Sequence, residues 1–222
     1  MDNDFDITEL EDFGASIAPE TVKTAENDLY HITVNDNGTL IISDKESGRV
    51  FFEMLTVMIG NENATGYNTK ADVVKHTSDE TYAFDIITHV PIPSTDFSIS
   101  TQFLPHEPKH QHVFIRVRLG KTDENIKFSI AYEDTGNDLT LRFPTGAEYP
   151  TVSSVTGALD DVFKFENEVT LTDAEGYIFT LKTAATELFA KATSGGDLDV
   201  IMRSIAPAIG KTRYFEFEIL TK

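Results

Sequence analysis

The order of apolar and polar residues along the chain predicts a succession of short β-strands. Residues 29–34 and 39–43 are rich in aliphatic, aromatic and β-branched residues, and Asn37 and Gly38 lie between them. An Asn-Gly pair readily adopts the positive φ angles of a hairpin connection. We therefore predict a β-hairpin over these residues. The polar segment 44–48, which ends in glycine before another apolar run, predicts a second turn and a further strand.

The same kind of alternation continues to the end of the sequence. In 126–133 and 213–220 the apolar residues occupy alternate positions, as expected for a strand with one buried and one exposed face. Helix-like periodicity is limited to residues 184–190. Further strands are predicted at residues 72–77, 81–90, 96–103, 112–119, 126–133, 138–143, 177–183, 187–193, 197–205 and 213–220.

A chain made almost entirely of alternating strands and turns is typical of an all-β protein. We predict a large antiparallel β-sandwich over residues 28–222, because sandwiches often reach ~200–250 residues as single domains. A hydrophobic content of 40%, with 16 Phe and 7 Tyr, is sufficient for a substantial core. Residues 1–27 lack strand alternation, so we predict a linker or short helical lead-in there, with the helix near residues 8–13.

Charge and cysteine content exclude several classes of function. The formal net charge is −19, from 37 acidic and 18 basic residues, and such a field repels phosphate backbones and anionic lipids. We expect neither a nucleic-acid partner nor a membrane partner. The sequence has no cysteine, which suits a reducing compartment. The acidic residues 1–6 do not match a signal peptide, and no apolar run approaches ~20 residues, so we expect a cytoplasmic protein.

A series of motifs between residues 25 and 220 is informative through its order. The series comprises N-D-N-G-T, L-I-I-S-D-K and S-G-R-V within 35–50, paired strands at 113–119 and 127–134, L-T-L-R-F-P-T-G at 139–146, and closing strands at 186–190 and 198–204. In this order the motifs resemble the C-terminal β-sandwich of family 38 glycoside hydrolases, the retaining α-mannosidases. The resemblance implies a supersandwich of the galactose mutarotase-like kind.

The resemblance also implies that this chain lacks a catalytic apparatus. Retaining glycosidases need two carboxyl groups ~5–5.5 Å apart, and in this family the nucleophilic Asp and the zinc ligands lie in an N-terminal α/β domain. No segment here resembles that domain. The chain is thus expected to be a non-catalytic module that packs on a catalytic α-mannosidase domain or subunit. We assign it no catalytic residue and no cofactor; zinc is expected in the partner, and carbohydrate is a possible ligand.

Three residues are candidates for substrate contact through the same resemblance. In the family, a loop with a G-D-x-Y pattern reaches the catalytic domain and lends its Tyr to the sugar site. Segment 60–68, G-N-E-N-A-T-G-Y-N, occupies the comparable place, so Tyr67 and its neighbour Asn68 are implied; a plain surface turn is the alternative. Arg142 matches a position that tends to be basic before F-P-T-G. Its alternative is an exposed Arg paired with a nearby carboxylate.

Histidine spacing suggests one metal hypothesis. His106, His110 and His112 give an H-x3-H-x-H pattern, and the last two would share one face of a strand, as in some zinc sites. Solvated histidines in a loop entering a strand fit the same pattern. We therefore assign no metal ligand.

Two other classes of function remain open. A self-contained mutarotase or epimerase would pair a His acid with a carboxylate base, for example His89 or His112 with Glu133. A stand-alone carbohydrate-binding module would stack sugars on aromatic rings; the lack of Trp counts against it, although exposed Tyr could substitute. A His–carboxylate pair in a cleft favours the enzyme, a flat Tyr surface the binding module, and an exposed apolar face the accessory module.

Overall fold

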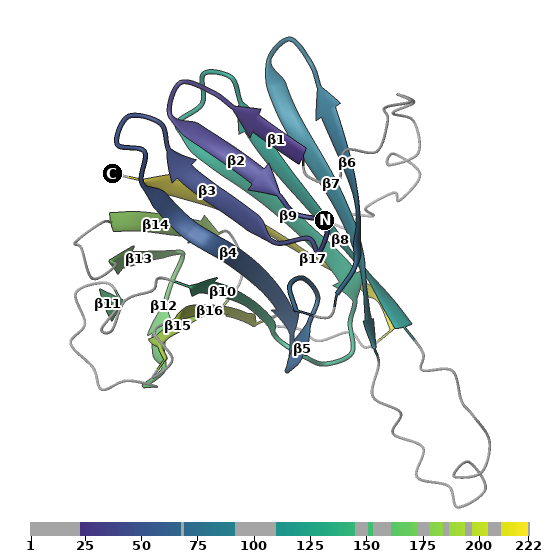
Figure 1. The fold of residues 1–222 in the computed structure, drawn as a ribbon. Coiled ribbons are helices and arrows are strands. Elements are labelled where there is room, and N and C mark those ends of the chain that lie inside the picture. Colours follow the sequence, from purple (N-terminus) through teal and green to yellow (C-terminus); the bar gives the residue numbers. More distant parts are fainter. Residues whose placement is uncertain are drawn as a thin grey trace, which may run out of the picture.

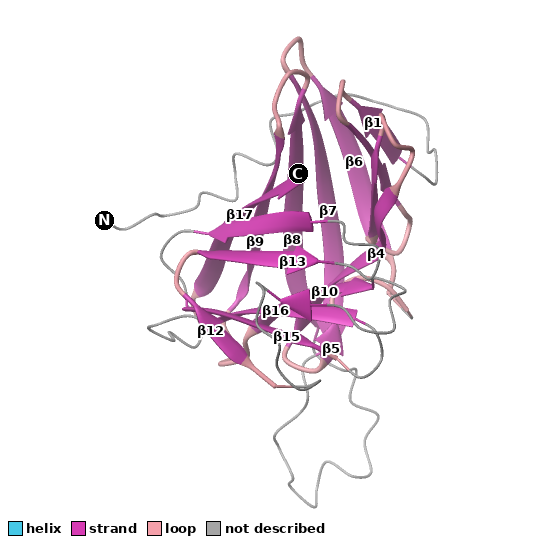
Figure 2. Cartoon of the chain, turned by 90° about the vertical axis from the view of Figure 1, so that its left-hand side faces the viewer, coloured by secondary structure: helices cyan, strands magenta, loops and turns pink. Residues whose placement is uncertain are grey.

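The computed structural model describes residues 23–67, 69–91, 110–144, 151–152, 161–172, 178–183, 187–193, 197–203 and 210–221. These residues form strands and turns without any helix (Figure 2). The all-β prediction is confirmed. Among the described segments there is accordingly no helix of the length and apolarity needed to cross a membrane.

The first sheet is antiparallel and contains nine strands among the described residues. The first four strands in this sheet are consecutive in sequence, whereas the next four come from later parts of the chain. In spatial order the strands are β1 (Lys23–Glu26), β2 (Tyr30–Val34), β3 (Leu40–Asp44), β4 (Val50–Ile59), β10 (Leu139–Pro144), β16 (Asp197–Arg203), β15 (Glu187–Ala192) and β12 (Phe163–Phe165), and β5 (Glu62–Asn63) pairs with β4.

The second sheet is also antiparallel, with eight strands in the described part of the chain. In spatial order they are β11 (Thr151–Val152), β13 (Glu168–Thr172), β14 (Ile178–Thr183), β17 (Thr212–Thr221), β9 (Asn125–Glu133), β8 (His110–Gly120), β7 (Thr81–Pro91) and β6 (Ala71–Thr77). Figure 1 shows β2 and β3 in front of β9 and β8, with β7 and β6 to their right. The two sheets form the predicted sandwich.

The core lies between the sheets and is built from the alternating apolar residues of both. Phe128 on β9 and Phe217 on β17 stack with ring centroids 4.7 Å apart. Phe143 on β10 meets Phe179 on β14 at 5.3 Å, which joins the first sheet to the second. Each such buried ring contributes about 1.5–3 kcal/mol through removal of apolar surface from water.

Two buried polar residues fasten the start of the first sheet to the second. The Tyr30 hydroxyl donates to the Glu124 carbonyl at 2.8 Å and lies 2.8 Å from Thr221 Oγ1. Asn27 Nδ2 donates to the Gly120 carbonyl at 2.9 Å, and its Oδ1 accepts from the Tyr30 amide at 2.7 Å. These bonds satisfy polar atoms that burial would otherwise leave unpaired.

The hairpin predicted from Asn37 and Gly38 is confirmed, with a longer connection than a two-residue turn. Val34 is the register partner of Leu40, and the intervening loop is closed by a bond from the Asn35 amide to the Thr39 carbonyl. Gly38 has φ 79°, and a Cβ there would lie 2.9 Å from Thr65 Cγ2. Glycine is thus required both by the backbone conformation and by packing.

Several boundaries differ from the sequence prediction. Residues 23–26 were expected in a linker, yet they form β1 and place Ala25 in the core. The helix-like periodicity of 184–190 does not produce a helix where the structure is described, since 187–192 is strand β15. Strands β12 and β13, of three and five residues, were not predicted, because so short a segment shows little alternation.

Other predictions lie outside the described residues. They are the helix near 8–13, most of the lead-in before residue 23, and the strand at 96–103.

Candidate functional site

A hollow on the outer face of the second sheet contains a charged cluster around one buried carboxylate. Asp85 on β7 alternates with the core residues Phe84 and Ile86, and so faces away from the core, yet it is only 9% exposed. Arg116 on β8 donates to both of its carboxylate oxygens, Nε to Oδ1 at 2.6 Å and Nη2 to Oδ2 at 2.8 Å. His76 Nε2 on β6 lies 2.9 Å from Oδ2. Three strands therefore bring a carboxylate, a guanidinium and an imidazole together.

Sheet register explains why these three side chains meet. Asp85 and Arg116 are direct cross-strand partners. Val74 is the partner of Asp85 on β6, and His76, two residues further on, shares the same face and reaches the carboxylate diagonally. Cross-strand and diagonal neighbours are the pairs that interact on one face of a sheet.

The walls of the hollow are mainly apolar, and its volume is about 160 Å³. They are formed by Val74, Ile87, Phe114, Ala131 and Tyr214. Burial and a hydrogen bond to Glu216 raise the pKa of Tyr214. Apolar walls lower the local dielectric and strengthen the charge interactions inside the hollow.

The hydrogen bonds define which of these groups could move a proton. An ionised carboxylate only accepts hydrogen bonds, so His76 Nε2–H donates to Asp85. In the neutral imidazole the lone pair is then on Nδ1. Arg116 orients the carboxylate through two hydrogen bonds. Asp85 is thus a positioning group, and the imidazole of His76 belongs to the residue type in this cluster that most readily exchanges protons near neutral pH.

Sequence reasoning did not single out His76, Asp85 or Arg116. Each lies on a different strand, and no local spacing connects them. The available signal was a charged residue in the middle of two apolar strands, which fits a solvated sheet face equally well.

Arg142, by contrast, was predicted from sequence, and it lies on the outer face of the first sheet. It donates to both oxygens of Asp199, Nε to Oδ1 at 2.8 Å and Nη2 to Oδ2 at 2.9 Å. Because Arg142 donates these hydrogen bonds to Asp199, its pKa is raised further above the usual range. Asp197 Oδ2 lies 3.6 Å from Arg142 Nε. Burial raises the pKa of Asp197, although the attraction of Arg142 opposes this.

Tyr67, the second predicted residue, lies in the loop between β5 and β6 and is 82% exposed. Its neighbour Asn68 lies outside the described residues. The loop is anchored by the Gly66 amide, which donates to the Asn37 carbonyl at 2.9 Å. A Cβ built on Gly66 would lie 3.5 Å from Thr56 Oγ1.

Thr56 connects this loop to the other predicted residue. It is the register partner of Arg142 on the neighbouring strand, so the two side chains share the outer face of the first sheet. The structure thus brings the Tyr67 loop and Arg142 to opposite sides of Thr56. Both are remote from the hollow around Asp85, which lies on the other sheet.

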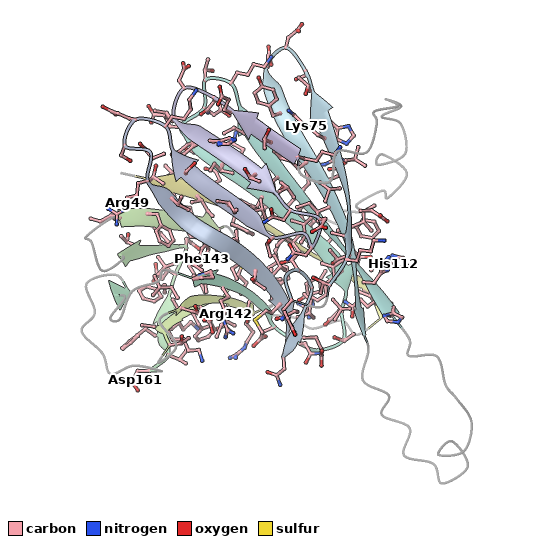
Figure 3. All side chains as sticks on the ribbon, in the orientation of Figure 1. Arg49, Lys75, His112, Arg142, Phe143 and Asp161 are labelled. Atoms are coloured by element: carbon pink, nitrogen blue, oxygen red, sulfur yellow. The ribbon has the colours of Figure 1, made fainter. Side chains whose placement is uncertain are left out.

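The predicted histidine pattern is only partly described. His106 lies outside the described residues, and His110 and His112 are exposed on β8. Within the described ranges, no group of three or more His, Cys, Asp or Glu is arranged to hold a metal ion. His112 and Glu133 line one hollow of about 350 Å³. Figure 3 shows His112 and Arg142 in well-separated parts of the molecule.

Comparison with known proteins shows the fold. No protein-family model matches the sequence, and no curated protein matches it significantly. An α-mannosidase from Enterococcus faecalis V583 aligns with TM-score 0.72 and 15% identity over 95% of this chain. A glycosyl hydrolase family 38 protein from Enterococcus faecalis aligns with TM-score 0.71 and 15% identity, also over 95%.

A third solved structure completes the comparison. A galactose mutarotase-like protein from Lactobacillus casei ATCC 334 aligns with TM-score 0.51 and 10% identity, over 90% of this chain and 100% of its own. The chain has the galactose mutarotase-like sandwich fold. It spans 30% and 31% of the two Enterococcus proteins, so it corresponds in fold to one part of each.

Proposed function

We propose that this chain is a non-catalytic β-sandwich module of an α-mannosidase-like retaining glycosidase, which packs on the catalytic domain and completes it. The observation that supports this most directly is the asymmetry of the alignments. The chain aligns with the α-mannosidase over 95% of its own length but 30% of the other's, at TM-score 0.72. Its likeness to the mutarotase-like protein has TM-score 0.51.

In this proposal Tyr67 and Arg142 lie on the side of the module that faces the sugar site. Tyr67 projects into solvent from a loop whose backbone is tied to the opening hairpin, so it can contact a partner without reordering the loop. Arg142 is held by Asp199, which fixes its direction. Asn68 is proposed to act beside Tyr67. The zinc ion belongs to the catalytic domain.

The proposal is tested with an aryl α-mannoside and added Zn²⁺. The rate of hydrolysis is measured for this chain alone and for the chain together with its catalytic domain. That domain comes either from a longer protein that contains this chain or from a glycosidase encoded by a neighbouring gene. Activity of the assembly together with a silent isolated chain supports the module; hydrolysis by the isolated chain overturns it.

A matched pair of variants tests the role of Tyr67 in the assembled enzyme. Tyr67→Ala should reduce kcat/KM by about tenfold, equivalent to ~1.4 kcal/mol of lost transition-state stabilisation. Val162→Ala removes another exposed apolar side chain, one that is 56% exposed, and should leave the rate unchanged. Equal effects of the two substitutions would argue against a specific contribution of Tyr67.

The His76–Asp85 pair favours a second candidate, a self-contained mutarotase or epimerase. Such enzymes need a proton-exchanging His near a carboxylate within a cleft, and the hollow provides both at 2.9 Å. Exchange spectroscopy on the α and β anomers of galactose and mannose tests it. If the wild-type chain accelerates interconversion of the anomers, and this acceleration is lost in His76→Gln but kept in His31→Gln, the result would favour the enzyme over the module. Without acceleration by the wild-type chain, this candidate fails.

A further inference from the structure

Two histidine rings contact each other on the outer face of the second sheet. His89 on β7 and His112 on β8 are direct register partners, and both are exposed. Their ring centroids are 4.5 Å apart, with the planes inclined at 68°. Phe114 stacks beside His112 at 6.2 Å. Among the described residues, neither imidazole forms a hydrogen bond or an ion pair.

Cross-strand placement holds the two imidazole rings side by side on one face of the sheet. Register partners in an antiparallel sheet have Cβ atoms about 4.5–5.5 Å apart, and the backbone ladder maintains that separation. Two imidazole nitrogens can then approach one ion at the ~2.0–2.1 Å distance typical of zinc sites. Because both rings are exposed, they can rotate toward a shared ion without disturbing the core.

Further oxygen ligands lie close to the pair. Val113 is the register partner of Tyr132, so Glu133 at the end of β9 is adjacent to His112 on the same face. Glu133 and His112 line one hollow of about 350 Å³. The observed side-chain positions do not form a three-ligand cluster in the described residues, so water or a rotated Glu133 would complete the coordination.

We propose that His89 and His112 form a binding site for a divalent transition-metal ion that prefers imidazole, such as Zn²⁺. Imidazole nitrogen selects zinc, copper and nickel over magnesium and calcium, which prefer oxygen ligands. The net charge of −19 raises the local concentration of cations around the molecule. The site is independent of the proposed glycosidase partner and of the zinc expected there.

This site differs from the one suggested by histidine spacing. The sequence pattern joined His106, His110 and His112 along one segment, whereas the structure pairs His112 with His89 on the neighbouring strand. Spacing along the chain cannot reveal a partner on another strand. The two assignments are distinguishable because only one depends on His89.

The test is calorimetric titration of the untagged protein with ZnCl₂. We expect one Zn²⁺ per chain, and His89→Ala and His112→Ala should each weaken binding by about tenfold or more. His31→Ala, a half-buried histidine on the first sheet, is the matched control and should leave the affinity unchanged. Excess Mg²⁺ should not displace the ion. Circular dichroism of each variant confirms that the fold is retained.

Three results would overturn the proposal. The first is the absence of Zn²⁺ binding to the wild-type chain. The second is binding that survives the double substitution His89→Ala/His112→Ala or that Mg²⁺ displaces, which would indicate general attraction to acidic residues. The third is a loss caused by His110→Ala but not by His89→Ala, which would favour the histidine pattern within 106–112 over the His89–His112 pair.

Discussion

Arg142 and Asp199 form a two-point ion pair between β10 and β16, with Nε–Oδ1 and Nη2–Oδ2 distances of 2.8 and 2.9 Å. Asp199 is 2% exposed, so Asp199→Asn would leave a partly buried guanidinium with a weaker partner. We expect a loss of about 1–2 kcal/mol in the free energy of unfolding, measured in urea. Lys191→Met, which removes a cation 4.0 Å from Asp199, should cost less than about 0.5 kcal/mol. An unchanged urea midpoint in Asp199→Asn would show that the pair does not stabilise the fold.

The Tyr30 hydroxyl links the two sheets through Glu124 and Thr221. Tyr30→Phe keeps the ring in the core but leaves the Glu124 carbonyl without this donor. We expect a decrease of about 1–2 kcal/mol in the free energy of unfolding. Tyr67→Phe removes a hydroxyl from an exposed ring and should change stability by less than about 0.5 kcal/mol. Equal denaturation curves for the two variants would contradict the cross-sheet role.

Gly38 and Gly48 provide a matched test of packing at positive φ, with φ angles of 79° and 69°. Alanine at either position adopts a left-handed conformation that costs about 1–2 kcal/mol. Only at Gly38 would the new Cβ also approach Thr65 Cγ2 at 2.9 Å, since nothing lies within 4 Å of it at Gly48. The steric clash should add about 1–3 kcal/mol of destabilisation to Gly38→Ala. We therefore expect Gly38→Ala to have a lower melting temperature than Gly48→Ala. A larger effect at Gly48 would be inconsistent with this packing.

Asp197 should make stability depend on pH in the direction opposite to a carboxylate whose pKa is lowered on folding. Burial raises its pKa above the ordinary value of 3.8, so the folded protein binds the proton more tightly than the unfolded chain. Its contribution to stability is therefore complete below that ordinary value and is lost as the pH rises through the raised one. Asn cannot ionise, so Asp197→Asn should not show this loss of stability at higher pH.

The measurement compares the free energy of unfolding of wild type and Asp197→Asn at about pH 3 and about pH 7. The free energy of unfolding of Asp197→Asn, relative to that of wild type, should be higher at about pH 7 than at about pH 3. Asp79→Asn, in the exposed turn between β6 and β7, is the control for removal of an acidic residue. A relative stability of Asp197→Asn that declines with rising pH would contradict the expected direction.

Much of the strand content follows from local chemistry that is visible in the sequence. Apolar residues at alternate positions in β9 and β17 reproduce the faces observed in the sandwich, and Asn37 and Gly38 mark the first hairpin correctly. The sequence was less informative for short strands such as β12 and β13, which have three and five residues. There the pairing with neighbouring strands, rather than intrinsic preference, determines the conformation.

The sequence by itself therefore determined the strand-forming segments, their turns and the strongly acidic surface. Tertiary structure decided which strands are neighbours, and hence that His76, Asp85 and Arg116 share one hollow and that Arg142 meets Asp199, 57 residues away. The physical reason is the range of the forces involved. Alternation and turn geometry depend on adjacent residues, whereas register is chosen when two whole sheets bury their apolar faces together.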